Sequence, residues 1–198
     1  MVDRVNVIGN GKSAMMFDQD NPGLNIVCNL PPIQMKKVYA SVMVDFKMMR
    51  AIAEGSVQVP FMWVLGARPK LFTEQQSGFF IQYAKQIREF HLDLPKYVAN
   101  YTDFNCGHMA THYGLKKFAP EEMHLYGFNS MFDFDLTSST DMFLESDRGA
   151  VNNTRLTNNW RNIWPQLFSE FPDTLFHLYH KHKNIKFNLP DNVVIITK

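Results

Sequence analysis

VNVIGNGKSA, at residues 5–14, predicts an apolar β-strand that runs directly into a glycine turn. Gly9 and Gly11 would let a ligand approach the backbone closely, and amides at the start of a following helix would face an anion. Asn10 adds an amide that can donate and accept, and Ser13 can cap the helix or donate to phosphate. The pattern therefore predicts a phosphate-binding turn, with an unliganded tight turn as the alternative.

Three nucleotide-binding loops share parts of this pattern, and two of them fit poorly. The Walker loop G-x-x-x-x-G-K-[ST] ends as residues 11–13 do, but its first glycine would fall at Asn6. The dinucleotide fingerprint G-x-G-x-x-[GA] fits residues 9–14, but an acidic side chain should follow about 20 residues later. Asn29 stands at that place. A mononucleotide loop of the form G-N-G-x-S therefore fits best.

Apolar runs alternate with helical patterns along the whole chain. Strands are predicted over residues 5–8, 24–28, 38–44, 60–65, 96–99, 123–126, 175–180 and 193–197, and helices over residues 46–55, 73–91, 107–119 and 159–171. Extension of the last helix is the alternative for residues 175–180. Because these strands lack clean polar alternation, we expect a buried, mostly parallel sheet. We predict an α/β, Rossmann-like single domain over residues 1–198, with helices on both faces. Residues 128–158, after the Tyr126-Gly127 strand end, are predicted to form a flap or lid.

The composition excludes several classes of protein. The 198 residues carry a net charge of +1, so no global field favours nucleic acid or an anionic membrane. None of the apolar runs reaches the ~18 residues that a membrane span needs, and the N-terminus shows no signal-peptide pattern. Cys28 and Cys106 lack metal-ligand spacing, which favours two buried reduced thiols. We therefore expect a cytoplasmic protein, and homo-oligomerisation stays open.

Several motifs resemble glycosyltransferase family 42, the bacterial sialyltransferases, and related pterin-pyrophosphokinase-like proteins. Those proteins begin with a strand, G-N-G-P-S and a second strand ending in C-N or R-N, as VNVIGNGKSA and NIVCN do here. Val44-Asp45, WVLGARP and NCGHMATHYGLKKFAPEEMHLYGFN follow in the family's order. The resemblance covers residues 4–130 and implies a Rossmann-like fold that binds a cytidine monophosphate sugar.

The resemblance also implies which residues bind this donor. In the family the glycine loop, the asparagine after the second strand and the start of a later helix surround the nucleotide. The residues at the matching positions are Gly9, Asn10, Gly11, Ser13, Asn29, Asn105, Cys106, Gly107 and Gly127. Lys12 stands where proline is usual, and it either pairs with phosphate or is solvated. Cys106 replaces the usual serine or threonine.

The sequence departs from the family at the catalytic base. Gly127-Phe128-Asn129 replaces Gly-x-Asp, and residues 128–158 contain no histidine, although the resembled enzymes carry their base there. Transfer to a hydroxyl needs a group that accepts its proton, so Asp133 and Asp135 become the candidate bases. The same segment offers further acidic candidates and phosphate-binding cations, namely Asp141, Glu145, Asp147, Arg148 and Arg155.

The predicted helix over residues 107–119 offers other chemistry. His108 at its start is a candidate catalytic residue, and His112 would share its face, as in a zinc-binding helix or as plain packing. Cys106 is also a candidate nucleophile, because a helix N-terminus lowers the pKa of a thiol.

Two further groups raise the question of a metal. Asp133-Phe134-Asp135 resembles a D-x-D motif that would hold a divalent cation, or else serves turn chemistry. His177, His180 and His182 lie near the C-terminus, but strand alternation would not place all three on one face. We expect a solvated edge there rather than a metal site.

The leading functional hypothesis is transfer of a sugar from a CMP-sugar-type donor to a hydroxyl acceptor that the sequence does not name. A non-catalytic nucleotide-binding or interaction protein on the same fold is the second hypothesis. A small pyrophosphokinase-like transferase is the third. The third would act on a pterin-like or nucleotide substrate, and the expected partner of the protein is a nucleotide or nucleotide sugar.

Overall fold

The computed structural model describes residues 2–97, 104–133 and 150–197, apart from the side chains of residues 150–155. One sheet of 8 strands has the order β5-β4-β3-β2-β1-β6-β7-β8, and neighbouring strands are parallel throughout. The strands are β1 (Arg4–Ile8), β2 (Leu24–Cys28), β3 (Ala40–Met43), β4 (Trp63–Leu65), β5 (Ile87–Phe90), β6 (Glu122–Tyr126), β7 (Leu175–Tyr179) and β8 (Val193–Ile196). The predicted α/β class is confirmed.

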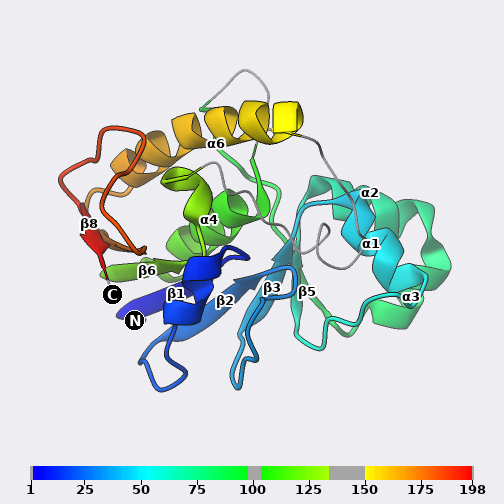
Figure 1. Cartoon of the computed structure of the whole chain (residues 1–198). Helices are drawn as coiled ribbons and strands as arrows, with labels where there is room; N and C mark the ends of the chain where they lie inside the picture. The colour runs from blue at the N-terminus through cyan, green and yellow to red at the C-terminus, as the bar shows by residue number, and fades with distance from the viewer. Residues whose placement is uncertain (1, 98–103, 134–149, 198) are drawn as a thin grey trace.

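Helices cover both faces of this sheet, as Figure 1 shows. They are α1 (Phe46–Ala53), α2 (Ala67–Gln75), α3 (Ser77–Tyr83), α4 (Cys106–Phe118) and α6 (Ala150–Glu170), with short 3-10 turns η1 (Lys12–Met16) and η3 (Asn129–Met131). Side chains of one strand alternate between faces, so neighbouring residues join different clusters. Val42 packs with the α4 and α6 cluster, whereas Met43 packs with α1, α2 and α3.

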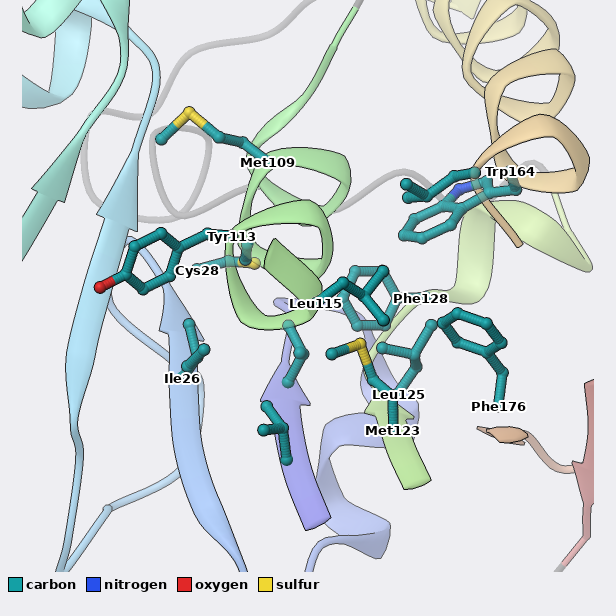
Figure 2. Packing of buried hydrophobic residues seen from close by; sticks show 14 of the residues in the cluster. Ile26, Cys28, Met109, Tyr113, Leu115, Met123, Leu125, Phe128, Trp164 and Phe176 are labelled. Atoms are coloured by element: carbon teal, nitrogen blue, oxygen red, sulfur yellow. The ribbon is translucent and has the colours of Figure 1, made fainter. Parts of the chain in front are cut away.

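The main core lies between the sheet and the pair α4 and α6. Figure 2 shows Tyr113 and Leu115 of α4 above Ile26 and Met123 of the strands, with Trp164 of α6 beside them. Each of these five side chains is almost fully buried. Burial on both faces explains why the strand sequences read as continuous apolar runs.

The order in which the chain adds strands to the sheet switches sides between β1 and β6. From β1 the chain proceeds outward through β2, β3, β4 and β5, and then returns to place β6 on the other side of β1. The loops that leave β1 and β6 therefore emerge from neighbouring strands at the carboxyl edge of the sheet. Such a switch point is where open α/β sheets bind ligands.

One predicted helix is wrong in its second half. The pattern over residues 73–91 suggested one helix, but α2 ends at Gln75, α3 covers Ser77–Tyr83, and Ile87–Phe90 forms strand β5. The amide of Trp63 donates to Gln86 O at 2.8 Å, and that of His91 donates to Leu65 O at 2.9 Å. Pairing with β4 satisfies backbone hydrogen-bonding groups at the sheet edge. The free energy gained from this pairing outweighs the helical preference of the local sequence. Lys96 and Tyr97 are not in a strand, and residues 98 and 99 lie outside the described residues.

The two ends of the expected flap belong to regular parts of the domain. Phe128, Asn129, Met131 and Phe132 are buried after β6, and residues 150–158 form the first half of α6. The helix predicted over residues 159–171 thus begins earlier than expected. Residues 134–149 lie outside the described residues, so a lid over the site stays a prediction for that part alone.

Candidate functional site

The candidate site is the carboxyl edge of the sheet at the switch point between β1 and β6. The end of β1 leads into residues 9–13, the end of β2 into Asn29, and the end of β6 into residues 127–129. The start of α4, at residues 105–107, packs against the same edge, because Cys106 donates to the carbonyl of Val42 near the end of β3. The structure therefore brings together all the positions that the resemblance assigned to the donor.

The glycine loop is held by hydrogen bonds to the loop after β6. Gly9 N donates to Tyr126 O at 2.7 Å, and Gly11 N donates to Gly127 O at 2.9 Å. Ser13 donates to Asn129 Oδ1 from its backbone amide at 3.1 Å and from its hydroxyl at 2.8 Å. Ser13 Oγ also accepts from Gly127 N at 3.1 Å. The groups expected to bind phosphate at Gly11 and Ser13 are therefore engaged within the protein.

The two loops approach so closely that a side chain larger than hydrogen at Gly9 or Gly11 would overlap the loop after β6. A Cβ on Gly11 would lie 2.5 Å from Asn129 Oδ1 and 2.8 Å from Gly127 O. A Cβ on Gly9 would lie 2.7 Å from Gly127 O. Gly127 itself has a φ of +81°, which L residues rarely adopt. The two glycines of the G-N-G pattern thus allow the loop after β6 to approach closely. The sequence pattern predicted that a ligand would occupy this close position.

Asn10 and Lys12 occupy the outer side of the glycine loop. Asn10 Nδ2 donates to Leu30 O at 2.8 Å, which ties the loop after β1 to the loop after β2. The side chain of Asn10 is partly exposed, and Lys12 is exposed. Any anion at this edge would therefore meet Lys12 before the engaged amides of Gly11 and Ser13.

Asn29 lies beneath the edge, with only 3% of its surface exposed. Its φ of 51° is left-handed, a conformation that asparagine tolerates better than most residues. Its amide donates to Val42 O at 2.9 Å, and its carbonyl accepts from the hydroxyl of Ser41. Asn29 thus anchors the turn after β2.

Cys106 is a buried thiol, and a nucleophilic role for it is wrong. Its Sγ donates to Val42 O at 2.7 Å and lies 3.8 Å from Asn29 Oδ1. Burial, followed by interaction with Cys28, raises the pKa of Cys106 well above its usual value. The thiol therefore stays protonated at neutral pH and cannot attack a substrate. Both cysteines are free and buried, as predicted.

His108 is a fully buried structural residue of α4, and the geometry leaves its ring no catalytic role. Its Nδ1 accepts from the Asn105 amide at 3.1 Å, while Asn105 Oδ1 accepts from the His108 amide at 2.9 Å, which forms a capping box. Its Nε2 donates to Trp160 O at 3.2 Å and so links α4 to α6. Burial lowers the pKa of His108 to about 3. Both ring nitrogens are engaged, so the neutral ring has no nitrogen left to accept a substrate proton.

The start of α4 also packs tightly against the loop after β6. A Cβ on Gly107 would overlap the ring of Phe128. His112, the proposed partner of His108 in a zinc helix, instead pairs with His91 across 2.9 Å. Because His108 and His112 engage different partners, they do not form a common metal site.

Asp133 lies near the carboxyl end of β6, beside His180 and His182. The sequence pattern did not predict this contact. Asp133 Oδ1 is 3.2 Å from His182 Nε2, and Asp133 Oδ2 is 3.6 Å from His180 Nε2. His180 is 1% exposed, so the expectation of a solvated edge is wrong for it. The available signal was a His-x-His pair directly after an apolar strand. Asp135, the other candidate base, lies outside the described residues.

The third C-terminal histidine belongs to a separate group, as strand alternation predicted. His177 stacks on His124 of the neighbouring strand, with ring centres 4.2 Å apart. His124 contacts Glu122 Oε2 through Nε2 at 2.9 Å and Tyr179 OH through Nδ1 at 3.0 Å. This group lies on β6 and β7, away from their carboxyl ends.

No protein-family model, curated protein or solved structure matches the chain. Within the described residues, none of the helices is both long and apolar enough to cross a membrane. A cavity of about 760 Å³, lined by Arg4, Lys36 and Lys37 among others, lies at the amino edge of β1–β3 and not at this site.

We expect Gly11→Ala to lower the free energy of unfolding by about 1–3 kcal/mol, because the added methyl group overlaps Asn129 and Gly127. Gly11 has a φ of -72°, so the loss would come from contact and not from backbone strain. Gly78→Ala is the matched control, since nothing lies within 4 Å of its Cβ position. Urea unfolding of both variants measures the difference. Equal stability of the two variants would mean that the loops separate readily.

We also expect the unfolding free energy to fall as the pH drops below about 6.5, the unfolded pKa of histidine. The folded pKa of His108 is about 3, so between these values the unfolded chain binds a proton that the folded chain does not. Each such histidine contributes a slope of up to about 1.4 kcal/mol per pH unit. His108→Phe is less stable, but its slope between pH 6 and pH 5, measured by urea unfolding, should be smaller by one proton. An unchanged slope contradicts the buried neutral state.

Proposed function

We propose that the protein binds a nucleotide-activated sugar of the CMP type at this edge and transfers the sugar to a hydroxyl acceptor. The observation that carries the proposal is the convergence of residues 9–13, Asn29 and the start of α4 at the switch point of a parallel sheet. Ligands of open α/β sheets bind at such points. The motifs at these positions are those that resemble the family 42 sialyltransferases.

The phosphate of the donor would lie on the outer side of the glycine loop. The amides of Gly11 and Ser13 already have protein acceptors, so a phosphate here depends on Lys12 and Asn10. A lysine at the proline position of the family motif adds a positive charge where negative charge develops on the leaving CMP. Such charge stabilisation is often the largest contribution to group-transfer catalysis.

The proton of the acceptor would be removed near Asp133. His108 is engaged on both ring nitrogens, so among the described candidate bases the chemistry moves to this carboxylate. Asp133 is linked to Asn129, the residue whose side chain accepts from Ser13, because Asp133 N donates to Asn129 O at 2.9 Å. The carboxylate thus belongs to the loop that closes the glycine turn.

A non-catalytic nucleotide-binding protein is the second candidate function. The observation in its favour is that His108 and Cys106, two reactive side chains at the start of α4, are both buried and engaged. Either function fits a cytoplasmic protein, since the two free buried cysteines suit a reducing compartment.

We expect Lys12→Gln to weaken CMP binding by about 10- to 100-fold, since a hydrogen bond to a charged group is worth about 1.5–3 kcal/mol. Lys36→Gln is the control, because this exposed lysine lies at the amino edge of the sheet. Isothermal titration with CMP, and with cytidine as the ligand without phosphate, measures the difference. Equal CMP affinity of parent and Lys12→Gln would place the phosphate elsewhere.

The same preparation distinguishes the two candidate functions. Release of CMP from a panel of CMP-sugars in the presence of sugar acceptors supports the transferase. CMP binding without any release moves the binding protein ahead. A parent protein that binds neither CMP nor CMP-sugars overturns the nucleotide proposal.

A further inference from the structure

We propose that Asp133, His180 and His182 bind one divalent transition-metal ion, of the Zn²⁺ type, at the carboxyl ends of β6 and β7. Their ligand atoms all lie within 4.8 Å of one another. The proposal goes beyond the proposed function and does not depend on it, because nucleotide binding needs no metal at this position.

The distances in the group suit a shared ion. Zinc bonds to nitrogen and oxygen are about 2.0–2.2 Å long, so two tetrahedral ligands lie about 3.3–3.5 Å apart. The observed separations from the Asp133 oxygens are 3.2 Å to His182 Nε2 and 3.6 Å to His180 Nε2. Only small side-chain movements would therefore be needed to place an ion between the three ligand atoms.

His180 provides an independent reason to expect an ion. The residue is 1% exposed, and its Nε2 is a buried atom that makes no hydrogen bond to any described residue. A buried polar atom without a partner costs free energy, and it faces a carboxylate oxygen. A cation between the nitrogen and the carboxylate would satisfy both.

The surroundings hold the His180 ring in the orientation that a ligand needs. The Phe132 ring stacks on it with centroids 4.0 Å apart and an interplanar angle of 3°. His180 Nδ1 lies 3.3 Å from His182 O and 3.4 Å from His182 N, so this atom can donate to the carbonyl or accept from the amide. Metal binding through Nε2 requires the tautomer in which Nδ1 donates to His182 O, because the lone pair of Nε2 is then available. Histidine ligands of metals commonly make such an outer hydrogen bond.

Asp133 is also positioned by its backbone. Arg161 Nη2 donates to Asp133 O, and Arg161 Nε donates to Ser130 O, both at 2.7 Å. The arginine of α6 thus fixes the turn that carries the carboxylate and leaves the carboxylate oxygens to face the histidines. Lys181 Nζ is 3.7 Å from Asp133 Oδ2, but its side chain is 73% exposed and can turn into solvent.

His182 would be the ligand that adjusts. Its side chain is 30% exposed, and its Nδ1 accepts from Asn184 N at 3.2 Å. Ligation through Nε2 puts the remaining ring proton on Nδ1, so this bond from Asn184 would be released as the ion binds.

The donor set indicates the class of metal. Two imidazoles and one carboxylate suit Zn²⁺, Co²⁺ or Ni²⁺, whereas Mg²⁺ and Ca²⁺ prefer oxygen ligands alone. Three protein ligands leave a tetrahedral ion one position for water or substrate, which is typical of catalytic sites. An ion here could lower the pKa of a bound hydroxyl, and Asp133 would then act as a ligand and not as a free base.

A second group, Glu122, His124 and His177, provides the internal control. Its ligand atoms also lie within 4.8 Å of one another. However, His124 uses both ring nitrogens for protein partners, Tyr179 and Glu122. We therefore assign the ion to the Asp133 group and not to this one.

The test is a titration of the full chain, without a histidine tag and after chelator treatment, with Co²⁺ alone and with Zn²⁺ alone. We expect one equivalent of Co²⁺ with the visible absorption of a four-coordinate ion, and displacement of that absorption by Zn²⁺. His182→Gln and His180→Gln should each weaken binding by more than about 100-fold, at least the effect of losing an outer-shell partner. His177→Gln should bind as the parent does.

His182 is the more exposed ligand, so His182→Gln keeps the test valid if His180→Gln does not fold. The proposal is overturned if the parent binds neither ion. It is equally overturned if His182→Gln binds like the parent, or if His177→Gln abolishes binding. Circular dichroism of each variant without metal establishes that a lost signal is not lost folding.

Discussion

The arrangement of this protein depends on the contact between Ser13 and Asn129. The loops after β1 and β6 leave neighbouring strands, and Asn129 Oδ1 accepts hydrogen bonds from both the amide and the hydroxyl of Ser13. Glycines at positions 9, 11 and 127 allow the two backbones to approach. This junction leaves the amides of Gly11 and Ser13 engaged with acceptors of the protein itself.

Helix α4 connects the junction between the two loops to β3 and α6. Gly107 packs directly against Phe128, which lies between Gly127 and Asn129, and Cys106 donates to the carbonyl of Val42 in β3. His108 then joins the start of α4 to α6 through Trp160 O. Reactive side chain types at a helix start are thus used to assemble the fold, because burial leaves them protonated or neutral and fully bonded.

The carboxyl edge consequently has two zones with different chemistry. Around β1 and β2 it carries the exposed Lys12, whose positive charge suits an anionic ligand. Around β6 and β7 it offers Asp133 with two histidines, which suit a cation. The two zones are joined by the segment from Asn129 to Asp133, since Asp133 N donates to Asn129 O.

The sequence alone determined the fold class and the strands on either side of the switch point. The apolar runs ending at Ile8, Cys28 and Tyr126 are buried on both faces, and such runs leave few alternatives to a central parallel strand. Strand β5 was missed, because its helix-like spacing is local whereas its pairing partner β4 is distant in the chain.

Only the tertiary structure decided the roles of the polar residues. The glycine loop has the same sequence whether its amides face a phosphate or another loop, and the fold supplied Asn129 as the acceptor. Likewise, Asp133 and His182 are far apart in the chain, and parallel pairing of β6 with β7 brings the ends of these strands together. Periodicity reports which face a residue occupies, but the partner on that face comes from packing between distant segments.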